Sequence, residues 1–107
     1  MKFATYLNTT NNVFSITGKN KEREEIGTGH MNLDKCHIMF LNITPGLQRQ
    51  GYGTEILNEM ERRALARGCD YLTVSTTSDS EPFWQKKGYH YAWYDPIRLG
   101  KRYKDLN

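Results

Sequence analysis

The 107-residue sequence lacks any long hydrophobic run and contains only two cysteines and three prolines. No apolar stretch approaches the roughly 20 residues that a transmembrane helix needs, so a membrane span is not expected. The first dozen residues carry neither the apolar segment nor the small-residue cleavage site of a secretory signal peptide. Cys36 and Cys69 do not have the spacing of metal ligands. We therefore expect no metal site, a cytoplasmic protein and two reduced thiols, with a disulfide as the less favoured alternative.

The charge excess is small and positive. Lysine and arginine total 15 against 12 acidic residues, which gives a formal net charge of +3 at pH 7. This favours an anionic partner without choosing among nucleic acid, a phosphorylated cofactor and an acidic protein surface. A slightly basic solvated surface would explain the same numbers. At this length we expect one domain, residues 1–107, with a single modest core.

Turn-forming residues divide the first part of the sequence into strands. A run of asparagine and threonine separates two strand-like segments, Lys2–Leu7 and Val13–Thr17, and so predicts a β-hairpin. Glu25–Leu33 and His37–Ile43 are expected to form a second hairpin. The last of these segments is almost continuously apolar, which is typical of a central strand covered on both faces.

The hydrophobic period then changes. From Tyr52 onward, apolar residues recur at helical spacing and charged residues take the opposite face, which predicts a helix that ends at Arg67 and Gly68. The next segment, Tyr71–Thr76, alternates like a strand. A strand–helix–strand unit implies one parallel strand pair joined by a crossover.

The last part of the sequence predicts a short helix and two closing strands. Ser78 and Glu81 have the spacing of a capping box ahead of a helix through Lys87. The closing strands are expected at Tyr89–Tyr94 and Ile97–Lys104. Since the remaining neighbours can pair antiparallel, the sequence predicts an α/β fold with a mixed, mostly antiparallel sheet.

The junction between Ile43 and Tyr52 has the features of an anion site. The first N–H groups of a helix lack intrahelical partners and carry partial positive charge, so they stabilise a phosphate placed there. Gly51 and Gly53 leave room for a phosphate to approach the backbone, and Arg49 adds a cation. A tight strand-to-helix turn would need the same glycines. The spacing matches neither the dinucleotide fingerprint nor the common phosphate loop.

Two motifs in this order resemble one known family. The pattern Ile43-x-Pro45, then Gln48-x-x-Gly51-x-Gly53 and an amphipathic helix, resembles the signature motif of the GNAT superfamily of N-acetyltransferases. The later segment FWQKKGY is similar to the family's aromatic-aromatic-x-x-x-Gly-aromatic segment. The resemblance covers roughly residues 25–94, and the ordered pair of motifs is more specific than either motif alone.

The resemblance implies the acyl-CoA N-acyltransferase fold, with the sheet splayed at its central parallel strand pair. Acetyl-CoA would lie in the opening and pass its acetyl group directly to an amine, without a metal. The residues that the resemblance assigns to acetyl-CoA binding are Leu41, Ile43, Gln48, Arg49, Gln50, Gly51, Tyr52, Gly53, Thr54 and Trp84.

The resemblance also suggests catalytic residues. Trp84 stands where many relatives carry the tyrosine that serves the departing sulfur, and an indole cannot give up its proton at neutral pH. Tyr89 and Tyr91 are nearby substitutes, although core packing is their alternative role. His37 falls on the position of the catalytic glutamate and could accept a proton at neutral pH, unless it is structural or an ordered water chain replaces it. Weaker candidates for the base are His30, Asp34 and His90.

The acceptor is less constrained. Relatives usually have a strand and two helices that wall the acceptor pocket, whereas only short strands are expected before Glu25 here. We therefore expect an open acceptor side, used by a lysine or N-terminus of a protein or completed by a second subunit in a homodimer. Two other functions stay open: a domain that binds acyl-CoA without transfer, and a nucleic-acid-binding protein. The latter would use Tyr89–Tyr94 with Arg98, Lys101, Arg102 and Lys104.

Overall fold

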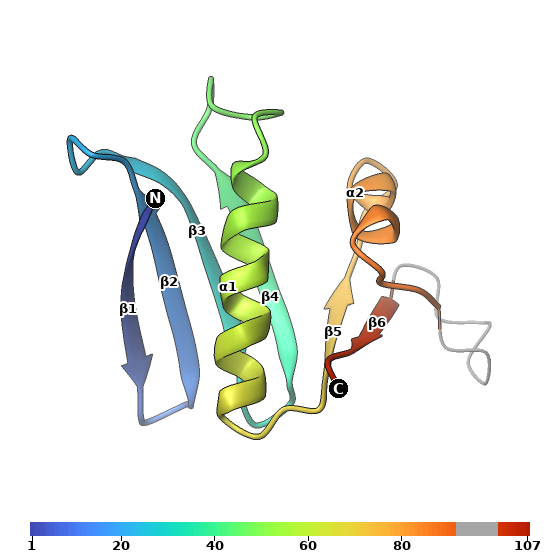
Figure 1. The fold of residues 1–107 in the computed structure, drawn as a ribbon. Helices are drawn as coiled ribbons and strands as arrows, with labels where there is room; N and C mark the ends of the chain where they lie inside the picture. Colours follow the sequence, from blue (N-terminus) through green and yellow to red (C-terminus); the bar gives the residue numbers. More distant parts are fainter. Residues whose placement is uncertain (92–100) are drawn as a thin grey trace.

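One six-stranded sheet with two helices forms the part of the protein that the computed structural model describes, residues 1–91 and 101–107 (Figure 1). The strands lie side by side in chain order. The elements are β1 (Lys2–Asn8), β2 (Val13–Lys19), β3 (Glu25–Asn32), β4 (His37–Ile43), α1 (Tyr52–Ala66), β5 (Tyr71–Ser75), α2 (Glu81–Lys86) and β6 (Lys101–Asp105).

The sheet opens at its only parallel neighbours among these strands, β4 and β5. The two strands pair through just two residue pairs, His37 with Thr73 and Ile38 with Val74, which join the beginning of β4 to the middle of β5. Every other neighbouring pair is antiparallel. Beyond the two pairs, β5 diverges from β4, as Figure 1 shows to the right of α1. The predicted mixed sheet and its splay at the parallel pair are both confirmed.

The core lies between α1 and one face of the sheet. Four apolar residues of α1, Ile56, Leu57, Met60 and Ala64, are buried. They belong to one core cluster with inward-facing side chains of the strands and with Trp84 and Tyr89. Burial of each large apolar side chain contributes about 1.5–3 kcal/mol, so this interface dominates the stability of the fold. The core residues are Phe14, Ile16, Met31, Ile38, Ile56, Leu57, Met60, Ala64, Cys69, Leu72, Val74, Trp84 and Tyr89.

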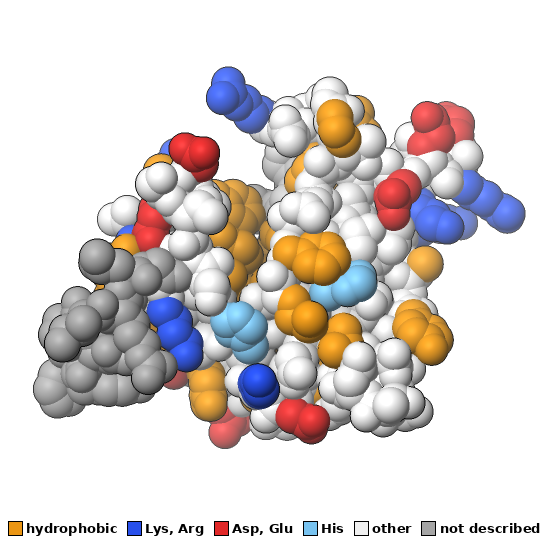
Figure 2. Space-filling view, turned by 180° about the vertical axis from the view of Figure 1, so that it is seen from behind, with side chains coloured by type: hydrophobic (Ala, Val, Ile, Leu, Met, Phe, Trp, Pro, Cys, Tyr) orange, Lys and Arg blue, Asp and Glu red, His pale blue; other side chains and the backbone are white. Residues whose placement is uncertain are grey.

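The opposite face of the sheet carries no helix among the described residues. Figure 2 shows this face, where hydrophobic and histidine side chains lie among polar ones. Three aromatic side chains on these strands are markedly exposed, Tyr6 at 66%, Tyr71 at 45% and Phe40 at 38%. His30 stacks on Phe40 with a centroid distance of 4.3 Å. This face therefore presents aromatic groups at the surface, and the predicted open acceptor side stays a prediction.

Two predictions about the C-terminal part of the chain, from Ser78 onward, differ from the structure. The capping box at Ser78 is wrong, because α2 begins after Ser80 and no side chain caps it; the Glu81 carboxylate turns toward β6 instead. The predicted strand Tyr89–Tyr94 lies partly outside the described residues, and its described part contributes a single bridge, between His90 and Tyr103. The predicted strand Ile97–Lys104 is described from Lys101 onward, as β6.

The expectation of free thiols is also wrong. Cys36 and Cys69 form a disulfide, with their Cα atoms 5.7 Å apart. The reason is topological: Cys36 immediately precedes β4 and Cys69 lies just before β5, and neighbouring parallel strands begin at the same edge of a sheet. The expected cytoplasmic location was tied in part to free thiols, and it loses that part of its support.

Two further findings concern only the described residues. Neither α1 nor α2 has the length and hydrophobicity to cross a membrane. Within residues 1–91 and 101–107, no three histidine, cysteine or acidic side chains come together as metal ligands would.

Candidate functional site

The loop from β4 to α1 presents backbone N–H groups rather than side chains. Gly51 caps α1 in the left-handed region, with a φ of 83°, and no side chain bonds to the helix start. The N–H groups of the first helical turn, from Tyr52 to Thr54, therefore point outward without an i−4 partner. Arg49 also has a positive φ, 65°. Alternation in the sign of φ turns successive N–H groups toward one side, which creates a concave site for an anion.

A cavity of about 450 Å³ lies over this loop. Its lining includes three cationic side chains, Arg49, Lys86 and Lys87, and none of the lining residues is acidic. The cations come from two separate elements, the loop before α1 and the end of α2. The full lining is Ile43, Gln48, Arg49, Gly51, Gly53, Thr54, Pro82, Phe83, Lys86 and Lys87. Together with the unpaired N–H groups, this composition suits a ligand with several negative charges.

A second cavity, of about 270 Å³, adjoins the first and shares four of its lining residues. It lies between the second half of β4 and α2, where the sheet has opened. Its lining carries no charged residue and mixes apolar with polar side chains: Leu41, Asn42, Ile43, Gln48, Gly53, Ser80, Phe83 and Trp84. The two cavities thus form one continuous site that is cationic at one end and uncharged at the other.

The structure brings together eight of the ten residues predicted to bind the donor. Those that line the two cavities are Leu41, Ile43, Gln48, Arg49, Gly51, Gly53, Thr54 and Trp84. Gln50 and Tyr52 belong to the same loop but line neither cavity. Sequence reasoning missed Asn42, Ser80, Pro82, Phe83, Lys86 and Lys87. All but one of the missed residues lie in or beside the aromatic motif around α2, so the motif itself was the available signal.

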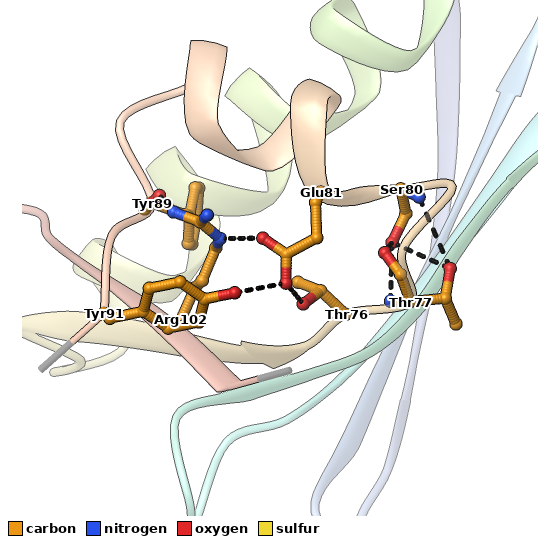
Figure 3. Close-up of polar contacts among 7 residues, drawn as sticks. All are labelled: Thr76, Thr77, Ser80, Glu81, Tyr89, Tyr91 and Arg102. Atoms are coloured by element: carbon orange, nitrogen blue, oxygen red, sulfur yellow. Dashed lines mark hydrogen bonds and ion pairs between the residues drawn. The ribbon is translucent and has the colours of Figure 1, made fainter. Parts of the chain in front are cut away.

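A polar network holds α2 against the end of the sheet (Figure 3). The Glu81 carboxylate accepts hydrogen bonds from the Thr76 hydroxyl, from the Tyr91 hydroxyl at 2.7 Å and from Nε of Arg102. These donors hold the pKa of Glu81 below its usual value. Arg102, only 8% exposed, also donates to the carbonyl oxygen of Tyr89 at 2.8 Å. The network ties α2, which walls both cavities, to β5 and β6.

Tyr89, predicted as a catalytic residue, does not reach the cavities. Its side chain is fully buried, and its hydroxyl donates to Oε2 of Glu61 at 2.8 Å. Burial, and then the charge of Glu61, raises the pKa of the Tyr89 phenol far above its usual value. A phenol held in this way is a poor proton donor for a thiolate, so its contacts support a packing role.

His37, the predicted base, lies where β4 and β5 still pair. This is the closed end of the opening between the two strands. Its Nδ1 is 2.6 Å from Oγ1 of Thr73 on the neighbouring strand. Burial lowers the pKa of His37 from its usual 6.5, and the positive charges of Lys101 and Lys35 lower it further. The imidazole is therefore neutral at pH 7, which is the form that can accept a proton.

The weaker candidates are engaged elsewhere. Asp34 accepts a hydrogen bond from Nδ2 of Asn12 at 2.8 Å in an exposed turn. His30 packs against the ring of Phe40, and His90 packs edge-to-face on Tyr103 at a centroid distance of 4.3 Å.

The basic tail expected for nucleic-acid binding is also used internally. Arg102 is buried in the Glu81 network, and Lys104 donates to Glu61 at 3.1 Å. Arg98 and the aromatic residues at 93 and 94 lie outside the described residues.

Comparison with known proteins agrees with this geometry. The family model described as an acetyltransferase (GNAT) domain matches residues 4–98. A Klebsiella pneumoniae protein titled as a candidate acyl-CoA N-acyltransferase is 22% identical, with a TM-score of 0.77 over 94% of this chain and 77% of that one. A Bacillus cereus acetyltransferase is 30% identical, with a TM-score of 0.67 over 87% and 72% of the two chains.

A third solved structure, an aminoglycoside 6′-N-acetyltransferase complexed with coenzyme A, shares the fold at 14% identity. Its TM-score is 0.75, over 89% of this chain and 73% of that one. The motifs, the splayed sheet and the family match agree, and the chain therefore belongs to the GNAT family of acyl-CoA-dependent N-acetyltransferases.

Proposed function

We propose that this protein transfers acetyl from acetyl-CoA directly to an amine, on a lysine side chain or at the N-terminus of a protein. One observation carries the donor assignment: the continuous site is cationic over the start of α1 and lined by no charged residue between β4 and α2. Acetyl-CoA has the matching polarity, with phosphates at one end and a less polar arm that ends in the thioester at the other.

The residues of the loop have distinct parts in donor binding. The outward N–H groups of Tyr52, Gly53 and Thr54 are suited to the pyrophosphate, which would also be near the guanidinium of Arg49. The apolar side chains of the lining, including Trp84, suit the arm. This arrangement would direct the thioester toward the closed end of the opening between β4 and β5, where His37 lies.

His37 is proposed as the general base. The amine nitrogen attacks the thioester carbonyl carbon, a C–N bond forms, and the C–S bond breaks to release the CoA thiolate. The proton lost by the amine goes to the neutral imidazole, and the thiolate takes up one proton to leave as CoA. No acyl group passes through the protein, so neither cysteine is needed for the reaction.

The bare sheet face supports a large acceptor. No described helix covers the face that carries His30 and Phe40, so a protein surface can approach it without displacing a helix of the described residues. A homodimer whose second subunit covers this face is the competing arrangement. Measurement of the mass in solution with and without acceptor separates the two.

The decisive experiment is a calorimetric titration of the folded protein with acetyl-CoA, with CoA and ATP as comparison ligands. We expect a micromolar dissociation constant for acetyl-CoA and weaker binding of ATP, which lacks the apolar arm. Binding with no turnover over a panel of proteins and small amines would instead favour the alternative function, a domain that binds acyl-CoA without transfer. No binding at all would refute the donor site.

Replacement of His37 by glutamine should slow transfer about 100-fold at neutral pH, a typical contribution of a general base. The effect should depend on pH with a definite sign. The pKa of His37 lies below 6.5, so its neutral form prevails above that pH and is lost as the pH falls further. The ratio of wild-type to variant kcat/KM should therefore shrink toward one in acid.

The wild type and the glutamine variant are assayed with the same acceptor. The acceptor's own titration therefore cancels in the ratio of their kcat/KM values. Calorimetry should give the same acetyl-CoA affinity for both. A ratio that stays constant across the pH range would remove His37 from the chemistry.

A further inference from the structure

A threonine from the neighbouring strand contacts the proposed base. The parallel register places Thr73 of β5 directly beside His37 of β4, and Oγ1 of the threonine lies 2.6 Å from Nδ1 of the imidazole. Thr73 alternates along β5 with Leu72 and Val74, whose side chains are buried in the core. Its hydroxyl therefore lies on the face away from α1, where the acceptor is proposed to bind.

Thr73 is itself fixed from two directions. Its backbone N–H donates to the carbonyl oxygen of Cys36 at 2.9 Å, and Cys36 is bonded to Cys69 at the beginning of the same strand pair. A β-branched side chain has few χ1 choices once its backbone is held. The position of the hydroxyl thus follows from the sheet register and the disulfide, rather than from contact with solvent.

We infer that Thr73 is a positioning residue that holds His37 in the tautomer able to act as a base. The inference rests on the proposed function. A neutral imidazole carries one N–H, and the hydrogen bond made by one ring nitrogen decides the state of the other. With Nδ1–H donating to Oγ1 of Thr73, Nε2 at the far side of the ring is left with a free lone pair.

The reverse arrangement would stop the proposed chemistry. If the Thr73 hydroxyl donated to Nδ1, the single proton would sit on Nε2, and the imidazole could not accept another at that atom while neutral. The charged groups that act on His37, Lys101 of β6 and Lys35 of the preceding turn, both disfavour the doubly protonated ring. The direction of one hydrogen bond therefore determines whether Nε2 is a base.

The test compares Thr73→Val with Thr73→Ser. Valine keeps the shape and suits a strand, so the fold should persist, and thermal melting checks this. Nitrogen-15 NMR of the three histidines, with His37 assigned by its absence in His37→Gln, reports the tautomer without any need for turnover. We expect protonated Nδ1 in the wild type and in Thr73→Ser, and a shift toward protonated Nε2 in Thr73→Val.

Kinetics give the second readout. In Thr73→Val we expect kcat to fall about 10-fold, with the KM for acetyl-CoA unchanged and the serine variant restoring the rate. An unshifted tautomer, or a wild type already protonated at Nε2, would overturn the inference. So would a shifted tautomer with full turnover, provided that His37→Gln is impaired. An unimpaired His37→Gln would refute the base assignment itself, and the positioning role with it.

Discussion

Replacement of Gly53 by glutamate should abolish acetyl-CoA binding, with a loss of at least about 100-fold, or about 3 kcal/mol. Gly53 lines both cavities and lies in the first turn of α1. A Cβ placed there would meet the ring of Phe83 at 3.5 Å and Ile43 at 3.7 Å, which are ordinary contacts. The fold can therefore accept a side chain at this position, and a longer one must extend into the site.

The glutamate carboxylate would act against the donor in two ways. It would occupy space at the outward N–H groups, and its charge would repel the pyrophosphate. The same charge is favourable for the helix itself, since an anion near a helix N-terminus is stabilised by the dipole. Loss of binding with an unchanged or higher melting temperature is thus the expected combination.

Two control variants separate the contributions to this loss. Gly53→Ala adds one methyl group in ordinary contact with its neighbours and should keep most of the affinity. Gly53→Gln has nearly the size of glutamate without the charge, so its affinity should fall between those of the other two. Thermal melting first checks that all three variants fold, and calorimetry then ranks their affinities for acetyl-CoA. Equal affinity of the glutamate variant and the wild type would place the pyrophosphate somewhere else.

Gly51 illustrates how much of the loop could be predicted from sequence. Its left-handed φ of 83° is a conformation that glycine adopts without strain, and the helical period from Tyr52 onward marks where α1 begins. Both signals are local, so the turn and the start of the helix after it were predicted correctly, while the anion site stays a prediction. The parallel strand pair also follows from the strand–helix–strand order.

The lining of the cavity depends on tertiary packing and could be predicted only in part. Lys86 and Lys87 are 37 and 38 positions beyond Arg49, and the aromatic motif that contains them is the local signal that α2 folds over the same loop. The aromatic motif predicted that α2 closes the site but not which of its side chains face inward. Trp84 was chosen from the family pattern, while Phe83 beside it lines both cavities.

Charged and aromatic residues near the end of the chain show the limit of reasoning from composition. Arg102 and Lys104 resemble a solvated basic tail in the sequence, yet each forms an ion pair with a glutamate of a helix, Glu81 and Glu61. Tyr89 resembles a candidate acid, yet it donates to the same Glu61. These partners lie 21 to 43 positions away, so the pairs exist only once the sheet has assembled.

The disulfide could have been predicted with more attention to topology. Cys36 comes directly before the strand that begins at His37, and Cys69 comes shortly before the strand that begins at Tyr71. Once these strands are expected to be parallel neighbours, their beginnings must lie together, and so must the cysteines. Two cysteines without metal-ligand spacing indicate free thiols only as long as the arrangement of the strands is left out of the argument.

Removal of the disulfide should lower the free energy of unfolding by about 3–4 kcal/mol in the chain-entropy account of cross-links. The two cysteines are 33 residues apart, a loop long enough for a large entropic effect. The loop they close contains β4 and α1, and β4 pairs with β5 at only two positions, so few other contacts hold the closed end of the opening together. Urea unfolding of a Cys36→Ser, Cys69→Ser double variant measures the loss.

Reduction should also affect the site, because Cys36 precedes His37 and its carbonyl oxygen accepts the N–H of Thr73. Freed from Cys69, this turn can move away from β5, and the hydrogen bond between Thr73 and the imidazole weakens with it. We expect dithiothreitol to lower both the melting temperature and kcat of the wild type, with little change in acetyl-CoA affinity, since the donor loop lies at the other end of β4. The double serine variant is the control: it should match the reduced wild type and be insensitive to dithiothreitol. Equal stability of the oxidised and reduced proteins would mean that the two residue pairs between β4 and β5, together with α1, are enough to keep the closed end in place.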